Sequence, residues 1–273
     1  MSSRSSKPLS DRVGLQLFSL RNQLDADLAG TLTLVAQMGF KRVEAYSLHG
    51  RTAEELRALL VDRGLSVGGY SASFERFEYD VANVIAEATI LGAPSIACAW
   101  IPHEGAYTAD TNQHAVEVFS KTGMLARAAG KRFVYHPHGY EFHPGGIGET
   151  LLDQMIHRTE PGVVDFELDV FWMVHAGADP IAYLERYPGR FPLLHLKDMR
   201  EGTPVGLRTA HASARSNVQL GTGVIDLVGI VSSAEMQGEP VYFIEDESDA
   251  VLRTLPGSLR FLLDLDLGAP KFS

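Results

Sequence analysis

The chain has 273 residues, of which 45% are apolar and 21% charged, the balance of a folded globular protein with a sizeable core. Its 24 basic and 34 acidic residues give a formal charge of −10, which argues against binding to a nucleic-acid backbone. The single cysteine, Cys98, excludes a disulfide framework and a cysteine-rich zinc module. No apolar run reaches the roughly 18–20 residues that cross a bilayer. We therefore expect a soluble cytoplasmic protein that binds neither nucleic acid nor a membrane, and the composition also allows a homo-oligomer.

Short strand-like runs alternate with amphipathic helical stretches along the chain. The expected strands are residues 13–19, 42–45, 65–71, 95–99, 132–136, 164–168, 193–196 and 241–244. The expected helices are residues 28–38, 52–64, 81–91, 112–129, 150–157, 181–187, 225–236 and 251–263. Eight strand–helix units predict an α/β fold, a single-domain (β/α)8 or TIM barrel over residues 13–273, after a flexible tail of residues 1–12. The rival fold is a doubly wound open sheet. It is disfavoured because the sequence has no glycine-rich phosphate-binding motif after the first strand.

Polar residues stand at the carboxyl ends of the expected strands, which meet on one face of such a barrel. Because side chains alternate along a strand, Glu167 and Asp169 share one face, and so do His195 and Lys197. Asp169, His195 and Glu245 fall at comparable heights on consecutive strands. Converging carboxylates and imidazoles would repel or stay unpaired without a cation between them. This pattern predicts a site for one divalent ion, with Mn²⁺, Mg²⁺, Co²⁺ and Zn²⁺ as candidates.

One strand-to-helix connection, residues 198–224, is longer than the usual ~2–6 residues. Long loops on this face of a barrel commonly close over substrates. We interpret the segment as a substrate-gripping lid, with Arg208 and Arg215 contacting an anionic or sugar group and Gly221 and Gly223 as a hinge.

Three segments carry motifs of a known family. Residues 135–142 read Tyr-His-Pro-His-Gly-Tyr-Glu-Phe, residues 168–180 contain Leu-Asp-Val-Phe-Trp, and residues 186–199 end in Leu-His-Leu-Lys-Asp-Met. Together with Gly14–Arg21 and Gly221–Asp226, they resemble the sugar phosphate isomerase/epimerase family of the xylose-isomerase-like barrel superfamily. The resemblance covers about residues 13–263 and implies a metal-dependent enzyme that acts on a small carbohydrate.

The resemblance also implies roles for individual residues. Its metal ligands would be Glu141, Asp169, His195 and Glu245, with His136 or His138 as substitutes for Glu141. Its catalytic groups would be Glu141, Glu245, His136 and His138. The chain departs from the family where Pro137 replaces a frequent asparagine and where Ser71–Ser73 replaces a frequent histidine.

Four further side chains at or just after strand ends are expected to contact the substrate: Glu44, Lys197, Trp100 and Trp172. A strand-end salt bridge is the alternative for Lys197, and plain packing is the alternative for the two tryptophans.

The predicted function is metal-dependent isomerisation or epimerisation of a keto-sugar or polyol-derived substrate through an enediolate. A metal-dependent lyase is the first alternative, similar to a 3-dehydroshikimate dehydratase or a keto-glycoside lyase. A sugar-binding barrel without catalysis is the second, because the segment 71–73 departs from the family. The superfamily's DNA-repair endonucleases are disfavoured by the charge of −10.

Overall fold

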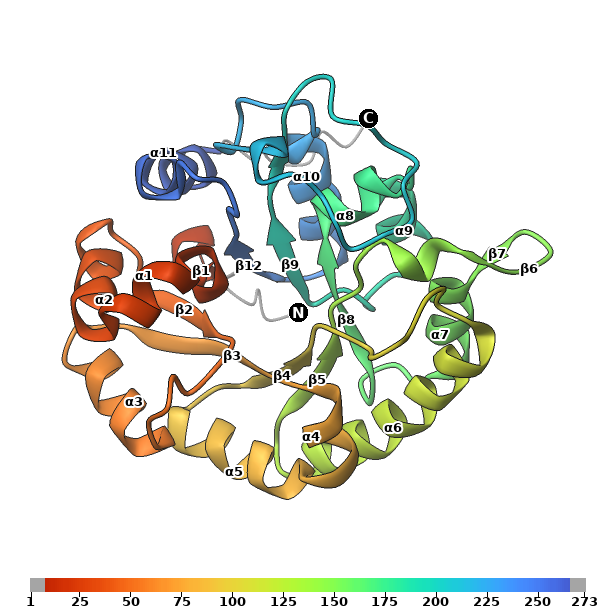
Figure 1. Cartoon of the computed structure of the whole chain (residues 1–273), viewed down its shortest axis with the longest axis horizontal. Coiled ribbons are helices and arrows are strands. Elements are labelled where there is room, and N and C mark those ends of the chain that lie inside the picture. Colours follow the sequence, from red (N-terminus) through yellow and green to blue (C-terminus); the bar gives the residue numbers. More distant parts are fainter. Residues whose placement is uncertain (1–7, 266–273) are drawn as a thin grey trace, which may run out of the picture.

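The computed structural model describes residues 8–265, and its centre is a closed barrel of eight parallel strands (Figure 1). Neighbouring strands follow the order β1, β12, β9, β8, β5, β4, β3, β2 around the barrel. Their bounds are β1 (Val13–Gln16), β2 (Arg42–Ala45), β3 (Ser66–Ala72), β4 (Ser95–Cys98), β5 (Arg132–Tyr135), β8 (Asp165–Asp169), β9 (Leu193–Leu196) and β12 (Val241–Ile244). This confirms the predicted fold, and each observed strand begins within one residue of its predicted start.

Helices surround the barrel on the outside (Figure 1). They are α1 (Arg21–Ala26), α2 (Leu28–Gln37), α3 (Ala53–Val61), α4 (Phe74–Tyr79), α5 (Val81–Leu91), α6 (Ala109–Ala128), α7 (Leu151–Arg158), α8 (Val170–His175), α9 (Pro180–Arg186), α10 (Leu227–Gln237) and α11 (Val251–Leu263). Capping explains several starts: Thr52 and Glu55 form a capping box before α3, and Asp179 precedes Pro180 at the start of α9. None of the helices described is long and apolar enough to cross a membrane.

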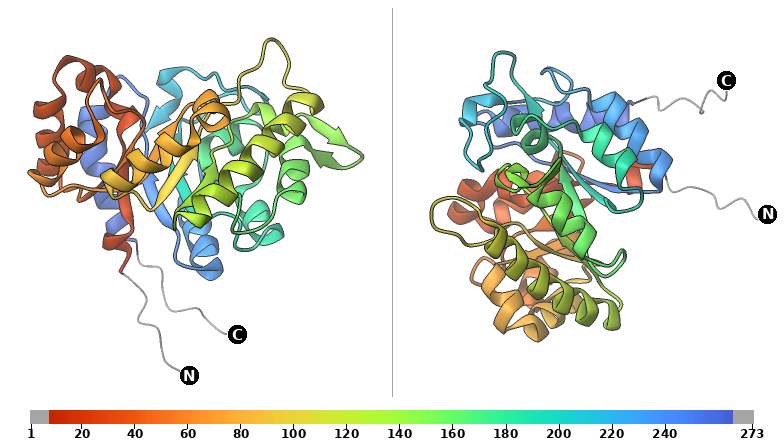
Figure 2. Two further views of the ribbon diagram at one scale, coloured as in Figure 1. Left: turned by 90° about the horizontal axis from the view of Figure 1, so that it is seen from below. Right: turned by 90° about the vertical axis from the view of Figure 1, so that its right-hand side faces the viewer.

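Two small antiparallel hairpins lie outside the barrel. One pairs β6 (Pro144–Gly146) with β7 (Glu149–Thr150), and the other pairs β10 (Asp198–Met199) with β11 (Asn217–Val218). The second hairpin belongs to the long connection after β9. Figure 2 shows this connection, in cyan, on the same side of the barrel as the dark yellow loop after β4. The predicted lid segment therefore lies on the face where the strands end.

The structure differs from the sequence prediction in short elements. β1 stops at Gln16 instead of residue 19 because a 3-10 helix, Leu17–Leu20, begins there, and the Gln16 side chain accepts the N–H of Phe18. Helices α1, α4 and α8 have six residues each, too few to display a helical period in the sequence. Further 3-10 helices span Leu9–Asp11, Tyr140–Phe142 and Ala214–Ser216.

The predicted tail, residues 1–12, is only partly described. Residues 1–7 lie outside the described residues. Within residues 8–12 the chain forms the 3-10 helix Leu9–Asp11, and the buried Arg12 pairs with Glu235 at 2.6 Å. The first barrel strand begins at Val13, the predicted start, and residues 8–12 lead into it.

An apolar layer fills the lower interior of the barrel. Ala97, Val134, Leu193 and Phe243 form a buried cluster there, each from a different strand. The Phe243 ring occupies the space beside Gly14, where a Cβ atom would lie 2.8 Å from Phe243 Cδ1 and 3.1 Å from the Arg42 carbonyl oxygen. This layer forms the floor on which the polar residues of the upper barrel rest.

We expect Gly14→Ala to destabilise the protein by about 1–3 kcal/mol, because the added methyl group overpacks the floor against Phe243. Thermal or urea unfolding measures the change. Gly146→Ala is the matched control, since its Cβ would meet only Gln154 Nε2 at an ordinary 3.6 Å on an exposed hairpin. Equal unfolding of the two variants would contradict the overpacking argument.

Candidate active site

His195 lies at the centre of a buried polar cluster above the floor. Its Nδ1 is 2.8 Å from Glu245 Oε2, and its Nε2 is 2.7 Å from Glu44 Oε2. Burial alone would lower the pKa of His195, but the surrounding carboxylates hold that pKa well above its usual value. The two ring nitrogens of His195 thus face carboxylates from β2 and from the end of β12.

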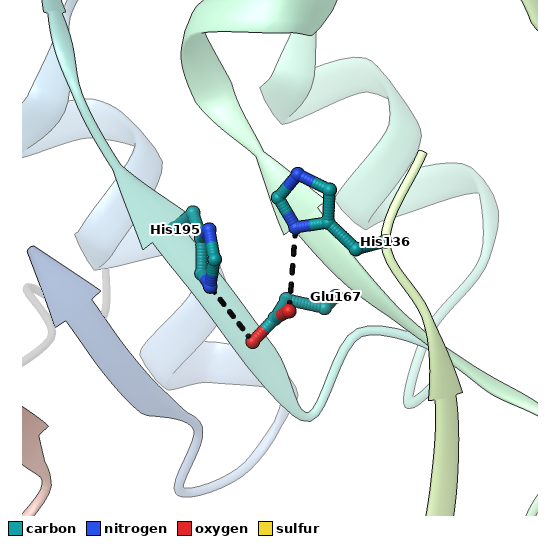
Figure 3. A group of neighbouring side chains, drawn as sticks. All are labelled: His136, Glu167 and His195. Atoms are coloured by element: carbon teal, nitrogen blue, oxygen red, sulfur yellow. Dashed lines mark hydrogen bonds and ion pairs between the residues drawn. The ribbon is translucent and has the colours of Figure 1, made fainter. Parts of the chain in front are cut away.

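Glu167 on β8 joins this cluster between two imidazoles, as Figure 3 shows. Its Oε1 is 3.2 Å from His195 Nε2, and its Oε2 is 3.3 Å from His136 Nδ1. Burial would raise the pKa of Glu167, yet the two imidazoles lower it to about 2. Burial and the nearby Glu167 raise the pKa of Glu44 to about 7. Gly69 leaves room for Glu44, because a Cβ there would lie 2.6 Å from Glu44 Oε1.

Lys197 provides a second buried cation one layer higher. Its Nζ lies 3.3 Å from Asp169 Oδ2, 3.2 Å from Glu245 Oε2 and 2.9 Å from Glu247 Oε1. Burial would lower the pKa of Lys197, but these three carboxylates raise it well above the usual value. Lys197 thus forms the strand-end salt bridge that was the alternative for it, and it also lines the cavity described below, while its contact with a substrate stays a prediction.

Two groups of these residues can hold a metal ion. Asp169, His195 and Glu245 form one, and His136, Glu167 and His195 form the other, with the ligand atoms of each group within 4.8 Å of one another. Glu167 Oε1 and Asp169 Oδ2 are buried without a hydrogen-bond partner. Glu167 Oε1 still lies 3.2 Å from His195 Nε2, and Asp169 Oδ2 lies 3.3 Å from Lys197 Nζ. Carboxylate oxygens grouped with imidazole nitrogens in this way fit a divalent ion that accepts mixed oxygen and nitrogen ligands.

Above the cluster opens a cavity of about 330 Å³. Its walls carry Trp100, Trp172, His136 and His138, all predicted site residues, while Ala210 of the long connection covers one side. The His138 ring packs 5.5 Å from Trp172, and its Nδ1 is shielded from solvent without a partner. Burial, with smaller effects of the nearby His136 and Lys197, lowers the pKa of His138 well below its usual value. His138 is thus a neutral imidazole with a free nitrogen.

The structure does not bring Glu141 together with the other expected ligands. Both carboxylate oxygens of Glu141 accept the backbone N–H of His138 at 3.1 Å, and Oε1 also accepts the Tyr135 hydroxyl. Glu141 belongs to neither metal-capable group and does not line the cavity. Residues Tyr140–Phe142 form a 3-10 helix, and Glu141 within it points back toward Tyr135 and the His138 backbone. Burial raises the pKa of this carboxyl to about 7.

Other predicted residues also lie off the cavity wall. Glu44 is completely buried below His195, so it contacts the cluster from beneath. Arg208 and Arg215 are exposed on the long connection and line neither this cavity nor an adjoining smaller one. The local pattern of a long loop does not reveal which of its side chains turn inward.

Sequence reasoning did not assign a role to Glu167 or Gln16. Glu167 was already placed on the inner face by alternation, two residues before Asp169, so that signal could have identified it. Gln16 lines the cavity and donates from Nε2 to Glu44 Oε2 at 2.7 Å. Its only sequence signal was its position near the end of the first strand.

The base of the long connection is fastened by Asp198. Its Oδ2 accepts the N–H groups of Gly221 at 3.0 Å and Gly223 at 2.8 Å, and its Oδ1 accepts those of Ile225 and Met199. A Cβ at Gly223 would lie 2.3 Å from Asp198 Oδ1, so the close approach requires glycine. The two glycines expected to form a hinge are held by hydrogen bonds at the barrel rim.

The fold and the site together define a TIM-barrel protein with a buried, metal-capable cluster at the carboxyl ends of its strands. Residues 32–264 match the family model described as xylose isomerase-like TIM barrel, and the chain belongs to that family.

Known proteins of this family include enzymes with different reactions. Inosose dehydratase of Geobacillus kaustophilus is 29% identical over 143 residues, which are 49% of this chain and 45% of that enzyme. The chain thus spans about half the length of the curated relatives that it matches. A sugar phosphate isomerase/epimerase from Parabacteroides distasonis has a similar structure, with a TM-score of 0.77, 22% identity and coverage of 98% of this chain and 97% of that one. A protein called IOLI, whose structure contains zinc, has a TM-score of 0.71 at 13% identity over 94% and 97% of the two chains.

We expect Asp198→Asn to loosen the long connection, because an amide replaces one of two acceptor oxygens with a donor that faces backbone N–H groups. The loss in unfolding free energy should be about 1–3 kcal/mol. Hydrogen exchange should rise at residues 217–225. Asp226→Asn is the matched control, since Asp226 caps α10 with one exposed hydrogen bond and asparagine caps equally well. Unchanged exchange in Asp198→Asn would contradict the fastening role.

Proposed function

We propose that this protein is a metal-dependent lyase that removes water from a cyclic keto-polyol or keto-sugar. The cavity supports a substrate of this size and polarity, because aromatic walls surround a charged base. The match to inosose dehydratases supports dehydration as the reaction. Isomerisation or epimerisation, the reaction first expected from the sequence, is the competing outcome of the test below.

Asp169, His195 and Glu245 are the proposed ligands, in agreement with the sequence prediction. Asp169 Oδ1 accepts the N–H of Trp172, so Oδ2, which accepts no hydrogen bond and lies 3.3 Å from Lys197 Nζ, is the oxygen that would hold an ion. The zinc in the similar IOLI structure supports a divalent ion at such a site. An ion bound there would supply positive charge beside the carbonyl oxygen of the substrate.

His138 is the proposed base, and this residue carries the proposal. It is neutral, its Nδ1 has no partner, and it lines the cavity. The carboxylates of Glu167 and Glu245 are poorer bases: burial would raise both pKa values, but neighbouring cations, mainly His195 for Glu167 and Lys197 for Glu245, lower them. The Lys197 ammonium lies in the same cavity and can stabilise negative charge on the substrate oxygen.

Each bond change in the proposed reaction is accounted for. The His138 ring takes the proton from the carbon next to the carbonyl group, and the electron pair of that C–H bond forms the new C=C bond. The C–O bond at the neighbouring carbon breaks, and the leaving hydroxide takes the proton back from His138 as water. One base is sufficient for this sequence.

Epimerisation has less support in the geometry. In the expected mechanism Glu141 and Glu245 exchange the proton from opposite sides of the carbon atom. Glu245 lines the cavity, whereas Glu141 is engaged with Tyr135 and the His138 backbone away from it. A cavity with one unprotonated imidazole and no second base placed opposite it therefore favours elimination.

We expect His195→Ala to weaken Mn²⁺ or Zn²⁺ binding by roughly tenfold or more, since His195 belongs to both metal-capable groups. The unmodified chain should bind about one ion per chain. Isothermal titration and elemental analysis measure both quantities. His157→Ala, on the exposed side of α7, should bind metal normally. Equal affinity in the two variants would refute the site, and a larger loss in Glu141→Gln than in Glu245→Gln would restore Glu141 as a ligand.

We expect the metal-loaded protein to convert 2-keto-myo-inositol, or another cyclic keto-polyol in a panel, into an unsaturated ketone with loss of water. Absorbance of the conjugated product and mass spectrometry measure the reaction. His138→Asn should lower kcat by about 10²–10⁴-fold with metal content unchanged, because it removes the base. His143→Asn, in the same loop but off the cavity wall, is the control. An epimer or isomer of unchanged mass as product would instead support the isomerase interpretation.

A further inference from the structure

A second, smaller cavity adjoins the proposed active site. Its volume is about 210 Å³, and it shares Trp172, Ala210 and Glu247 with the main cavity. Its other lining residues come from α1 and the long connection: Arg21, His211, Ala212, Ala214 and Asn217. The two cavities therefore meet along a common wall.

Two residues that line the second cavity, Asn217 and Trp172, each carry a buried polar atom without a hydrogen-bond partner. Asn217 is 6% exposed and its Oδ1 has none, while Trp172 is 5% exposed and its indole Nε1 has none. Burying such groups unpaired is unfavourable, so each indicates a missing partner. The amide oxygen only accepts and the indole N–H only donates. A hydroxyl group does both, and a polyhydroxylated ring offers several.

The charges along this cavity favour a neutral occupant. Arg21 contributes a guanidinium, which lies 4.5 Å above the Phe18 ring and donates to the Phe18 carbonyl oxygen. Glu247 contributes a carboxylate, which pairs with Lys197. An anion beside Arg21 would also face this carboxylate, whereas neutral hydroxyl groups can bond to both side chains.

The wall between the cavities is held in place. Ala210 follows Thr209, whose carbonyl oxygen packs so closely on Gly139 that a Cβ there would lie 2.3 Å away. Three residues before Ala210, Leu207 donates its N–H to the His175 carbonyl oxygen at 3.0 Å. These contacts hold the long connection against the loop after β5 and the end of α8. The wall that the two cavities share is therefore fixed in position.

We propose that the second cavity is a subsite for a second, neutral sugar unit, so that the substrate is a two-ring glycoside whose keto ring occupies the main cavity. This inference rests on the proposed function for the identity of the first ring. Asn217, Trp172 and Arg21 bind the hydroxyl groups of the second ring. They determine specificity and take no part in the chemical step.

Binding of matched sugars to the metal-loaded protein tests this subsite. The probes are glucose, its neutral disaccharides cellobiose, maltose and trehalose, and glucose 6-phosphate as an anionic comparison. Isothermal titration should show at least one disaccharide binding roughly tenfold tighter than glucose. Disaccharides that bind no tighter than glucose overturn the proposal, and so does tighter binding of glucose 6-phosphate alone.

Two variants assign the preference to the second cavity. Ala214→Trp fills it, and Asn217→Leu removes its orphaned acceptor at similar size, so each should abolish the disaccharide preference. Val205→Trp is the control, because Val205 is exposed on the same connection and lines neither cavity. A preference that survives in Ala214→Trp and Asn217→Leu overturns the assignment. Dehydration by the unmodified chain is measured separately, so its failure would reject the proposed function and leave the binding result standing.

Discussion

The interaction on which the site depends is the contact of one buried imidazole with carboxylates from distant strands. His195 reaches Glu44 with one ring nitrogen and Glu245 with the other, across a barrel interior that excludes water. Like-charged carboxylates cannot share such a volume without cations between them. His195 and Lys197 lie between these carboxylates, so the metal-capable groups and the cavity above them are both organised around these two residues. The apolar floor beneath them keeps water from replacing these contacts.

The sequence was sufficient to predict the barrel because strand and helix signals repeat eight times, and a misplaced boundary does not alter that count. Asp169, His195 and Glu245 could also be predicted to converge, because strand alternation and barrel geometry fix their positions. Glu141 could not be placed, since its direction depends on the 3-10 turn that follows Pro137. The path of residues 198–224 depends on contacts with distant segments, such as the four N–H groups that Asp198 accepts. For that reason the roles of Arg208 and Arg215 remain predictions.

The same contacts that organise the cluster also restrict its chemistry. The cations nearby, mainly His195 for Glu167 and Lys197 for Glu245, lower the pKa values of these two carboxylates, which makes each a good partner for a cation and a weak acceptor for a proton. The environment of His138 has the opposite effect. Burial, together with nearby positive charge, lowers the pKa of His138 and keeps its imidazole neutral. Roles are thus divided by environment, with carboxylates suited to hold an ion and His138 suited to move a proton.

This division links the cavity to a reaction type. Inverting a carbon centre requires one group to remove a proton and a second group to return one on the other side, whereas eliminating water can use a single group for both transfers. Glu141 would be the second base, and burial raises its pKa to about 7, but its oxygens are engaged by the Tyr135 hydroxyl and the His138 N–H. By holding that N–H, Glu141 fixes the loop that presents the His138 ring to the cavity. The carboxylate that the family resemblance implied as a ligand thus positions the proposed base, His138, and the proposed elimination needs no second group on the opposite side.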